Sequence, residues 1–189
     1  MLLARNRKGF HCGGVLINNR YVLTASHCVN GKDLPPTWQL THVRLGEWDI
    51  SSVEDCDDSF VNEIVCSPPP IDIVIEQLIP HENYNVQISN QHHDIALLRL
   101  QQTVNFNEFI APICLPINSD VRNNNFVGQS LTVAGWGKTE TENASKFKLK
   151  VNVDGVTNEK CQQKYATQQR KIANSQFCAG GKRDKGKII

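Results

Sequence analysis

The sequence predicts an all-β protein, and three observations support this fold class. Short apolar segments recur along the 189 residues, with clusters of Pro, Asn and Gly between them. One segment alternates strictly between apolar and polar side chains, which is typical of a strand with one buried face. Strands and helices do not alternate, as they would in a parallel sheet. Many short strands separated by turns favour a barrel or a sandwich.

Strands are expected along most of the chain. Two apolar runs flank Asn18 and Asn19, and Asn tolerates the positive φ of a tight hairpin turn. Further strands are predicted at residues 41–48, 71–79, 94–100 and 130–137. The alternating segment is 147–153, and the apolar face of that strand consists of Phe147, Leu149, Val151 and Val153. One short helix is predicted at residues 159–166, with Asn158 as its N-cap.

Length and charge exclude several classes of protein. A chain of 189 residues is long enough for one sizeable core, so a single domain is expected. The 20 Lys and Arg residues nearly balance the 19 Asp and Glu residues and are mostly scattered, which argues against a nucleic-acid partner. No apolar run approaches the roughly 18 residues of a membrane span, so no membrane partner is expected.

The seven cysteines indicate a secreted protein. This number is higher than a reduced cytosolic protein of this length usually carries, and the spacings suit local disulfides. No Cys-x-x-Cys pair occurs, which argues against thioredoxin-like and zinc-ribbon proteins. Only four apolar residues precede the first charge, which is too few for a secretory signal. We therefore expect an extracellular protein whose export signal lies outside this chain.

Several short motifs occur together. They are His-Cys-Gly-Gly at residues 11–14, Thr-Ala-Ser-His-Cys at 24–28, His-His-Asp at 92–94, Pro-Ile-Cys-Leu-Pro at 112–116 and Ala-Gly-Trp-Gly at 134–137. In their order and spacing they resemble the chymotrypsin/trypsin family of serine proteases from about Phe10 to Gly181. The chain resembles in particular the clip-domain proteases of insects. The resemblance implies a chymotrypsin-like fold of two six-stranded β-barrels, the first mostly present in this chain and the second incomplete.

The resemblance assigns chemistry to two side chains. His27 matches the family's general base, and Asp94 matches the carboxylate that orients it. A serine hydroxyl is a poor nucleophile near neutral pH, so a base must remove its proton. A carboxylate on the other ring nitrogen fixes the tautomer and stabilises the imidazolium. Ser26 departs from the family's more usual Ala, and we interpret this as an exchange of one small residue for another.

The nucleophile of the triad is not found in these residues. The family carries it in a Gly-Asp-Ser-Gly-Gly turn that follows a segment like Phe177–Gly181. None of the ten serines has glycines two positions away on both sides, and Ser130, which comes nearest, opens a predicted strand. We therefore expect residues 1–189 to form a partial trypsin-like domain that lacks the activation N-terminus and the nucleophile segment. As it stands, this polypeptide is expected to be inactive.

The resemblance also implies how the cysteines pair. It predicts the disulfides Cys12–Cys28, Cys56–Cys66 and Cys161–Cys178. Cys114 is then left over, and an odd cysteine in a secreted protein suggests a bridge to another segment. In clip-domain proteases the matching cysteine joins the catalytic domain to the N-terminal regulatory clip domain. The alternative for Cys114 is a free buried thiol.

An acidic loop at residues 46–58 carries six carboxylates. In related proteases this loop can hold Ca²⁺ through carboxylate and carbonyl oxygens, which are hard ligands for a hard cation. The candidate ligands are Glu47, Asp49 and Glu54, with Asp57 or Asp58 as a further one. The alternative, a solvated acidic loop, has equal weight. The expected activity requires no cofactor.

Two further patterns have a weaker basis. Asn143 begins an Asn-Ala-Ser glycosylation sequon, a motif that also occurs often by chance. His92, His93 and Asp94 are metal-binding residue types in a row. Adjacent residues on a strand point to opposite faces, so these three make a poor shared site and we do not expect zinc.

The resemblance implies a serine endopeptidase of an extracellular proteolytic cascade in immunity or embryonic patterning. Its expected partners are a protein substrate, in particular a zymogen, and serpin inhibitors. One alternative is a non-catalytic serine-protease homologue that acts as a binding cofactor, although the retained His27 and Asp94 argue mildly against it. Another is a truncated product without function, because unpaired strand edges and uncovered apolar faces oppose folding.

Overall fold

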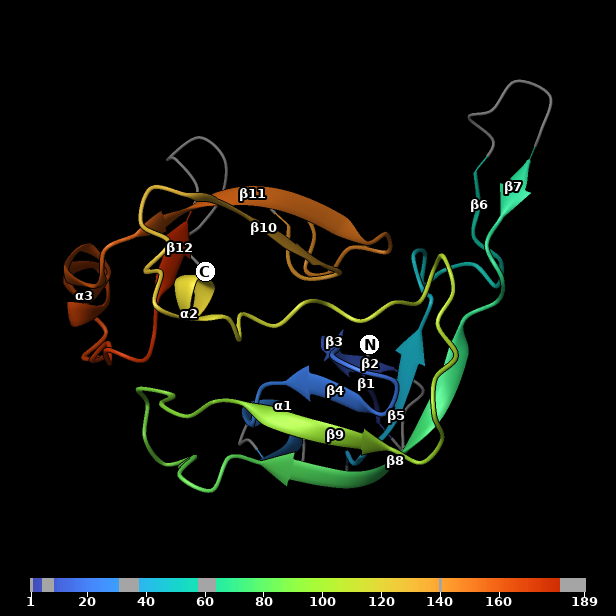
Figure 1. The fold of residues 1–189 in the computed structure, drawn as a ribbon, viewed down its shortest axis with the longest axis horizontal. Helices are drawn as coiled ribbons and strands as arrows, with labels where there is room; N and C mark the ends of the chain where they lie inside the picture. The colour runs from blue at the N-terminus through green and yellow to red at the C-terminus, as the bar shows by residue number, and fades with distance from the viewer. Residues whose placement is uncertain (1, 5–8, 31–37, 58–63, 140, 181–189) are drawn as a thin grey trace. The chain divides into compact units, whose positions relative to one another are not determined.

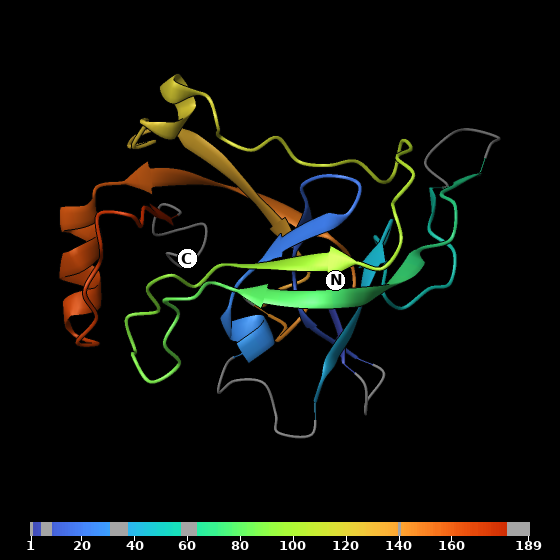
Figure 2. The same ribbon diagram turned by 60° about the horizontal axis from the view of Figure 1, so that its bottom comes forward.

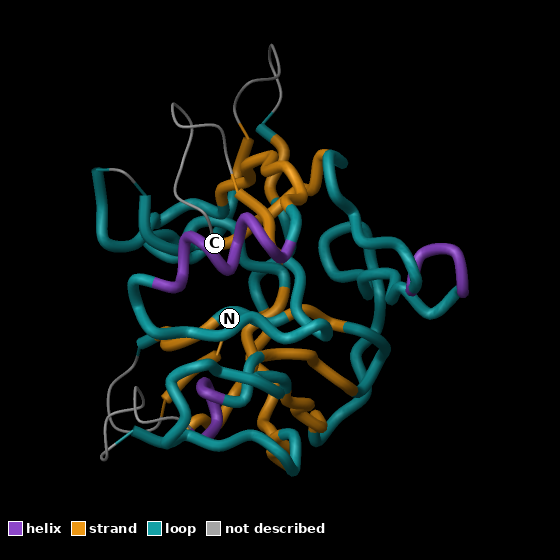
Figure 3. The backbone as a smooth tube through the Cα atoms, turned by 90° about the vertical axis from the view of Figure 1, so that its left-hand side faces the viewer, coloured by secondary structure: helices purple, strands orange, loops and turns teal. Residues whose placement is uncertain are grey.

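The computed structural model describes residues 2–4, 9–30, 38–57, 64–139 and 141–180 of a mostly β protein. Its strands, labelled in Figure 1, are β1 (Leu2–Ala4), β2 (Phe10–Cys12), β3 (Val15–Leu16), β4 (Tyr21–Thr24), β5 (Leu40–Leu45), β6 (Cys56–Asp57), β7 (Val65–Cys66), β8 (Ile71–Pro80), β9 (Ala96–Leu100), β10 (Ser130–Gly135), β11 (Leu149–Val156) and β12 (Cys178–Gly180). The helices are α1 (His27–Asn30), α2 (Ser119–Arg122) and α3 (Asn158–Ala166), drawn in purple in Figure 3. Within the described segments, no helix is long and apolar enough to cross a bilayer.

The chain divides into two compact units. Unit 1 comprises Met1–Gln87 and His93–Leu115, and unit 2 comprises Ile88–His92 and Pro116–Ile189. Unit 1 contains a seven-stranded sheet and the short pair β6–β7, and unit 2 contains a three-stranded sheet and α3. Each unit therefore has its own sheet.

The sheet of unit 1 is curled, and its two edge strands are consecutive in the sequence. The strand order is β2-β1-β5-β8-β9-β4-β3, with antiparallel pairing throughout, and Figure 2 shows β8 and β9 side by side. The edge strands β2 and β3 are separated only by Gly13 and Gly14. A Cβ atom at Gly14 would lie 2.9 Å from Val22 Cγ1, so this bend requires glycine.

The predicted hairpin is confirmed as β3 and β4, but its turn works differently. Neither Asn18 nor Asn19 has a positive φ. Instead, Asn18 Oδ1 accepts the backbone N–H groups of Arg20 and Tyr21 at 2.8 and 2.9 Å. The turn is therefore shaped by a side-chain hydrogen bond, which is the other property that makes Asn frequent in turns.

Alternating residues of the sheet form the core of unit 1. Val22, Val43, Leu98 and Leu100 are at most 1% exposed, and alternate positions of β9 face inward as strand geometry requires. Strands β4 and β9 pair from Tyr21 opposite Arg99 to Thr24 opposite Ala96. The segment that follows β4 and the segment that precedes β9 therefore leave the sheet at the same end.

The sheet of unit 2 has the order β10-β11-β12. Strand β10 pairs with β11 over Leu149–Asp154, whereas β12 pairs only with Asp154–Val156. Val153 is 4% exposed, whereas the other three residues of the predicted apolar face are more than two-fifths exposed, namely Phe147, Leu149 and Val151. In the described structure, the predicted burial of this face is wrong for its N-terminal part, because that part has one neighbouring strand only.

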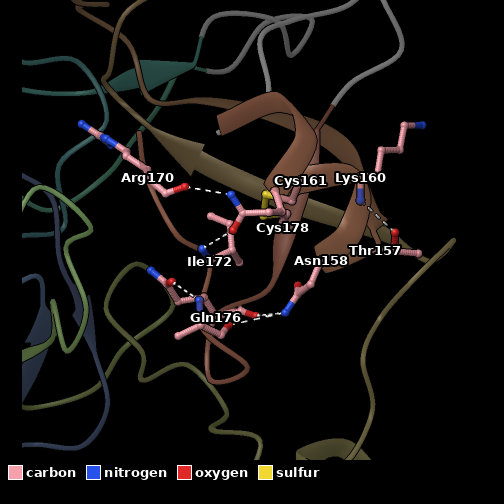
Figure 4. The surroundings of a disulfide bond; sticks show 10 residues. Thr157, Asn158, Lys160, Cys161, Arg170, Ile172, Gln176 and Cys178 are labelled. Atoms are coloured by element: carbon pink, nitrogen blue, oxygen red, sulfur yellow. Dashed lines mark hydrogen bonds between the residues drawn. A yellow bond between two sulfur atoms is a disulfide. The ribbon is translucent and has the colours of Figure 1, made fainter. Parts of the chain in front are cut away.

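Helix α3 begins with a different cap from the predicted one. Thr157 is the N-cap, and its Oγ1 accepts the Lys160 N–H at 3.3 Å. Asn158, the predicted cap, is the first helical residue, and its Nδ2 donates to the carbonyls of Ala173 and Gln176 at 3.4 and 3.0 Å (Figure 4). The prediction was wrong because two cap-forming residues stand next to each other, and contacts to a distant loop engage the second.

Candidate active site

His27 and Asp94 are in direct contact within unit 1. His27 Nδ1 lies 2.7 Å from Asp94 Oδ2, and the His27 backbone N–H donates to Asp94 Oδ1 at 2.8 Å. Because an ionised carboxylate only accepts hydrogen bonds, Nδ1 carries the proton, and the neutral ring presents Nε2 as a base. The His27 side chain is 33% exposed and that of Asp94 17%. A reactant can therefore reach the ring, while the carboxylate is largely shielded from solvent.

Strand pairing explains why two residues so distant in the sequence meet. His27 begins α1, shortly after β4, and Asp94 lies shortly before β9, the partner of β4. Asp94 is the centre of a three-residue turn, because the Ile95 N–H donates to the His93 carbonyl at 2.8 Å. His93 has a φ of 60°, in the left-handed region, which breaks the extended chain just before Asp94. Both side chains are thus held at the same end of one strand pair.

The Cys12–Cys28 disulfide lies beside the histidine. It joins the end of β2 to α1, and its Cys28 Sγ lies 3.6 Å from His27 Nε2. With a sequence separation of 16, such a bridge contributes about 3 kcal/mol in the chain-entropy model. Disulfide sulfurs are weak acceptors, so Nε2 keeps its basic lone pair. They are also not thiolates, so the cluster of Cys12, His27 and Cys28 is not a metal site.

The structure brings together the cysteine pairs that the resemblance implied. They are Cys12–Cys28, Cys56–Cys66 and Cys161–Cys178. The second bridge joins β6 to β7, and the third ties α3 to β12 (Figure 4). Cys114 forms no disulfide among the described residues and is exposed, so the alternative of a buried thiol is wrong.

The three consecutive metal-binding residue types take separate partners. His92 Nε2 lies 3.0 Å from the Lys171 carbonyl oxygen. The ring of His93 stacks on that of His81, with 4.8 Å between centroids. Asp94 is engaged by the histidine described above. Across the described ranges, the groups of potential metal-ligating atoms that lie close together do not include these residues.

The organiser of the acidic loop is Asp55, which was not among the candidate ligands. Its side chain accepts the backbone N–H groups of Trp48 and Asp49 at 2.9 and 3.1 Å and the Ser52 hydroxyl at 2.9 Å. Asp55 is 8% exposed. The sequence offers no pattern that separates this carboxylate from its acidic neighbours, because the difference lies in how the loop folds back on itself.

Glu47 is buried and paired with a cation. Its Oε2 lies 3.3 Å from Arg44 Nη1, and only 1% of its side chain is exposed. The Arg44 guanidinium also binds Asp72 through two hydrogen bonds of 2.7 and 2.8 Å. These bonds and the charge of Asp72 raise the pKa of Arg44, and the Arg44 guanidinium lowers the pKa of Asp72 below its ordinary 3.8.

The remaining candidate calcium ligands do not converge with Glu47. Asp49 Oδ1 accepts the N–H and hydroxyl of Ser51 at 2.9 and 2.7 Å, and Glu54 is exposed. Asp57 belongs to β6, and Asp58 lies outside the described residues. Within the described part of the loop, the carboxylates of Glu47, Asp49 and Asp55 accept hydrogen bonds from N–H groups, hydroxyls and a guanidinium. Calcium binding by Glu47, Asp49 and Glu54 stays a prediction.

The sequon residue Asn143 is exposed in unit 2. The third residue of the sequon, Ser145, is 6% exposed, and its backbone N–H donates to the carbonyls of Trp136 and Gly137 at 3.2 and 3.3 Å. Asn143 therefore stands beside a fixed turn with its own side chain accessible. Glycosylation there stays a prediction.

The chain matches a known protein family and curated proteins of insects. The family model described as Trypsin matches residues 1–188. The chain is 49% identical to Serine protease ea of Drosophila melanogaster, an alignment that covers 95% of this chain and 46% of that protein. It is 51% identical to CLIP domain-containing serine protease HP8 of Bombyx mori, over 92% of this chain and 46% of that protein. The chain thus spans about half the length of the curated relatives that it matches.

A solved structure agrees with the fold. The chain of the Drosophila Grass clip serine protease of the Toll pathway matches with a TM-score of 0.80 and 37% sequence identity. The match covers 95% of this chain and 49% of that one.

Proposed function

Because the chain belongs to the trypsin family of serine proteases, we propose that His27 and Asp94 are the base and the orienting carboxylate of a secreted serine endopeptidase. The observation that carries the proposal is the 2.7 Å contact between His27 Nδ1 and Asp94 Oδ2. In the proposed reaction, His27 Nε2 takes the proton of a serine hydroxyl as this attacks the peptide carbonyl. Asp94 stabilises the imidazolium, which then protonates the leaving amine.

We place these two residues on the first of two six-stranded barrels and the nucleophile outside the 189 residues. None of the ten serines stands between the glycines that a tight nucleophile turn uses. His27, whose side chain is one-third exposed, therefore has no serine of that kind among these residues to deprotonate. The polypeptide 1–189 is proposed to be inactive by itself.

The proposed substrate is a protein zymogen in an extracellular cascade. Two further relatives, each 44% identical, are named Spaetzle-processing enzyme, from Drosophila melanogaster, and Phenoloxidase-activating factor 1, from Holotrichia diomphalia. Both names describe action on another protein. The three disulfides support an oxidising, extracellular location. Serpins are the proposed inhibitors, and the exposed Cys114 is the proposed attachment point of a regulatory clip domain.

The role of His27 is tested with a fluorophosphonate probe, which labels an activated serine. The polypeptide 1–189 is expected to take up no label. A longer polypeptide that joins this sequence to a Gly-Asp-Ser-Gly-Gly segment is expected to be labelled and to cleave a zymogen. In that polypeptide His27→Ala abolishes both signals, and Asp94→Asn lowers kcat by about 10⁴-fold, the loss known for this type of triad.

The matched control is His92→Ala, since His92 is a neighbouring histidine bonded to the Lys171 carbonyl rather than to Asp94. It should leave labelling unchanged. Stoichiometric labelling of residues 1–189 would show that the missing-nucleophile argument is wrong. If the longer polypeptide binds its zymogen but does not cleave it, and His27→Ala changes nothing, the chain is a non-catalytic homologue.

A further inference from the structure

Ser26, the residue before the proposed base, is completely buried. Its exposed fraction is 0%, although it stands only one position from His27, whose side chain is one-third exposed. A buried hydroxyl needs hydrogen-bond partners, because an unpaired polar group in the interior is costly. Small size alone therefore does not account for a serine here, and its two partners show what else the hydroxyl does.

The hydroxyl joins three segments of unit 1. Ser26 Oγ donates to the Ile95 carbonyl at 2.6 Å and accepts the His81 N–H at 3.2 Å. The His81 N–H also donates to the Ile95 carbonyl, at 3.0 Å. Ser26 lies between β4 and α1, His81 directly follows β8, and Ile95 directly precedes β9. The three groups form a closed triangle of hydrogen bonds.

Two corners of this triangle are covalent neighbours of the proposed dyad. Ser26 precedes His27, and Ile95 follows Asp94. We propose that Ser26 is a positioning residue: its hydroxyl fixes the backbone at Ile95 against the backbone at His27, so that the Asp94 carboxylate meets the His27 ring. This inference rests on the proposed role of His27 as base, but it concerns the hydrogen bond between the two side chains.

The proposed positioning role depends on the hydroxyl of Ser26 rather than on the volume of its side chain. Alanine at position 26 would leave the His81 N–H bonded to the Ile95 carbonyl, so β8 and β9 would stay paired. The hydroxyl bond from the histidine segment to the Ile95 carbonyl would be lost, and the direct bonds from His27 to Asp94 would then hold the two segments without it. Ser26→Ala is therefore expected to fold and to loosen the contact between His27 and Asp94 specifically.

The test follows the proton between His27 Nδ1 and Asp94 by NMR, using the full 189-residue chain with nitrogen-15-labelled histidine. We expect a low-field resonance for this proton in the unchanged chain. In Ser26→Ala its exchange with water should become about fivefold faster, the ratio equivalent to one net hydrogen bond of about 1 kcal/mol. Its chemical shift should move toward that of a free imidazole N–H.

Thr24→Val is the matched control. Thr24, the last residue of β4, also carries a largely buried hydroxyl and is 9% exposed, but this hydroxyl donates to the Gly13 carbonyl at 2.8 Å and not to the aspartate segment. This variant should lower the melting temperature and leave the His27 proton unchanged. An unchanged proton in Ser26→Ala, or equal changes in both variants, would overturn the proposal.

A replacement variant and the signal of the unchanged chain complete the test. If Ser26→Ala does not fold, Ser26→Gly, which also removes the hydroxyl, replaces it: faster exchange of the His27 proton supports the proposal, and an unchanged rate overturns it. A folded unchanged chain that lacks the resonance would also overturn it, because the contact itself would be missing. The resonance requires no serine nucleophile. If the longer polypeptide takes up no label but the His27 proton still exchanges faster in Ser26→Ala, the endopeptidase proposal is wrong and the positioning role of Ser26 is supported.

Discussion

At the scale of single residues, the pair Arg44–Asp72 makes a testable contribution to stability. The folded-state pKa of Asp72 is lowered, so its stabilising effect is present above the ordinary value of 3.8 and is lost as the pH falls through the lower folded value. Asp72 is 37% exposed, and solvent screening limits the expected loss in Asp72→Asn to about 0.5–1 kcal/mol at neutral pH.

Urea unfolding of both proteins at neutral pH and in acid measures this difference, which should vanish in acid. Asp120→Asn changes an exposed carboxylate that has no ion pair in the described part of the chain, and it should have little effect at either pH. A difference between Asp72→Asn and the unchanged protein that persists in acid would mean that the side chain acts by packing rather than by charge.

Also at this scale, motifs in the sequence pointed to His27 and Asp94, which the structure places in contact, but not to the residues around them. The pair stands in motifs whose chemistry is recognisable without a structure. The role of Ser26 depends on Ile95, which is 69 residues away, and that of Asp55 depends on a loop closing over it. No local pattern reports either of these partners, so the sequence alone accounts for Ser in place of Ala only by its small size.

At the scale of secondary-structure elements, Thr157 is expected to stabilise α3. Replacing an N-cap threonine by alanine costs about 1 kcal/mol, so Thr157→Ala should shift the urea midpoint of unit 2 measured by circular dichroism. Thr167→Ala is the control at the other end of the helix, where the hydroxyl donates to the Lys164 carbonyl and a surface change should stay within about 0.5 kcal/mol. A larger loss in the control would show that the cap assignment is wrong.

Strand positions were predictable because alternation and turn residues are local signals. Strands β8, β9 and β10 lie where they were expected, at residues 71–79, 94–100 and 130–137. Exposure was harder to predict, as the N-terminal part of 147–153 shows. Whether an apolar face is covered depends on which strands pair beside it, and the alternating pattern does not contain that information.

At the scale of the whole molecule, the disulfides lie within the units and not between them. Cys161–Cys178 belongs to unit 2, and the other two bridges belong to unit 1. Replacing both cysteines of the unit 2 bridge by serine should destabilise that unit by about 3 kcal/mol. Hydrogen exchange of the β11 amides should then accelerate, whereas the β8 and β9 amides serve as the internal control. Equal acceleration in both sheets would show that the two units unfold together.

The pairing of β4 with β9 has a consequence for the order of events during folding. The His27–Asp94 contact spans 67 residues of chain, and contacts between such distant residues form slowly because a large loop must close first. The intervening strands β5 and β8 pair with nearer neighbours in sequence. We therefore expect His27 to meet Asp94 only once the sheet is assembled, so that a partly folded chain does not hold the histidine ring in its final orientation.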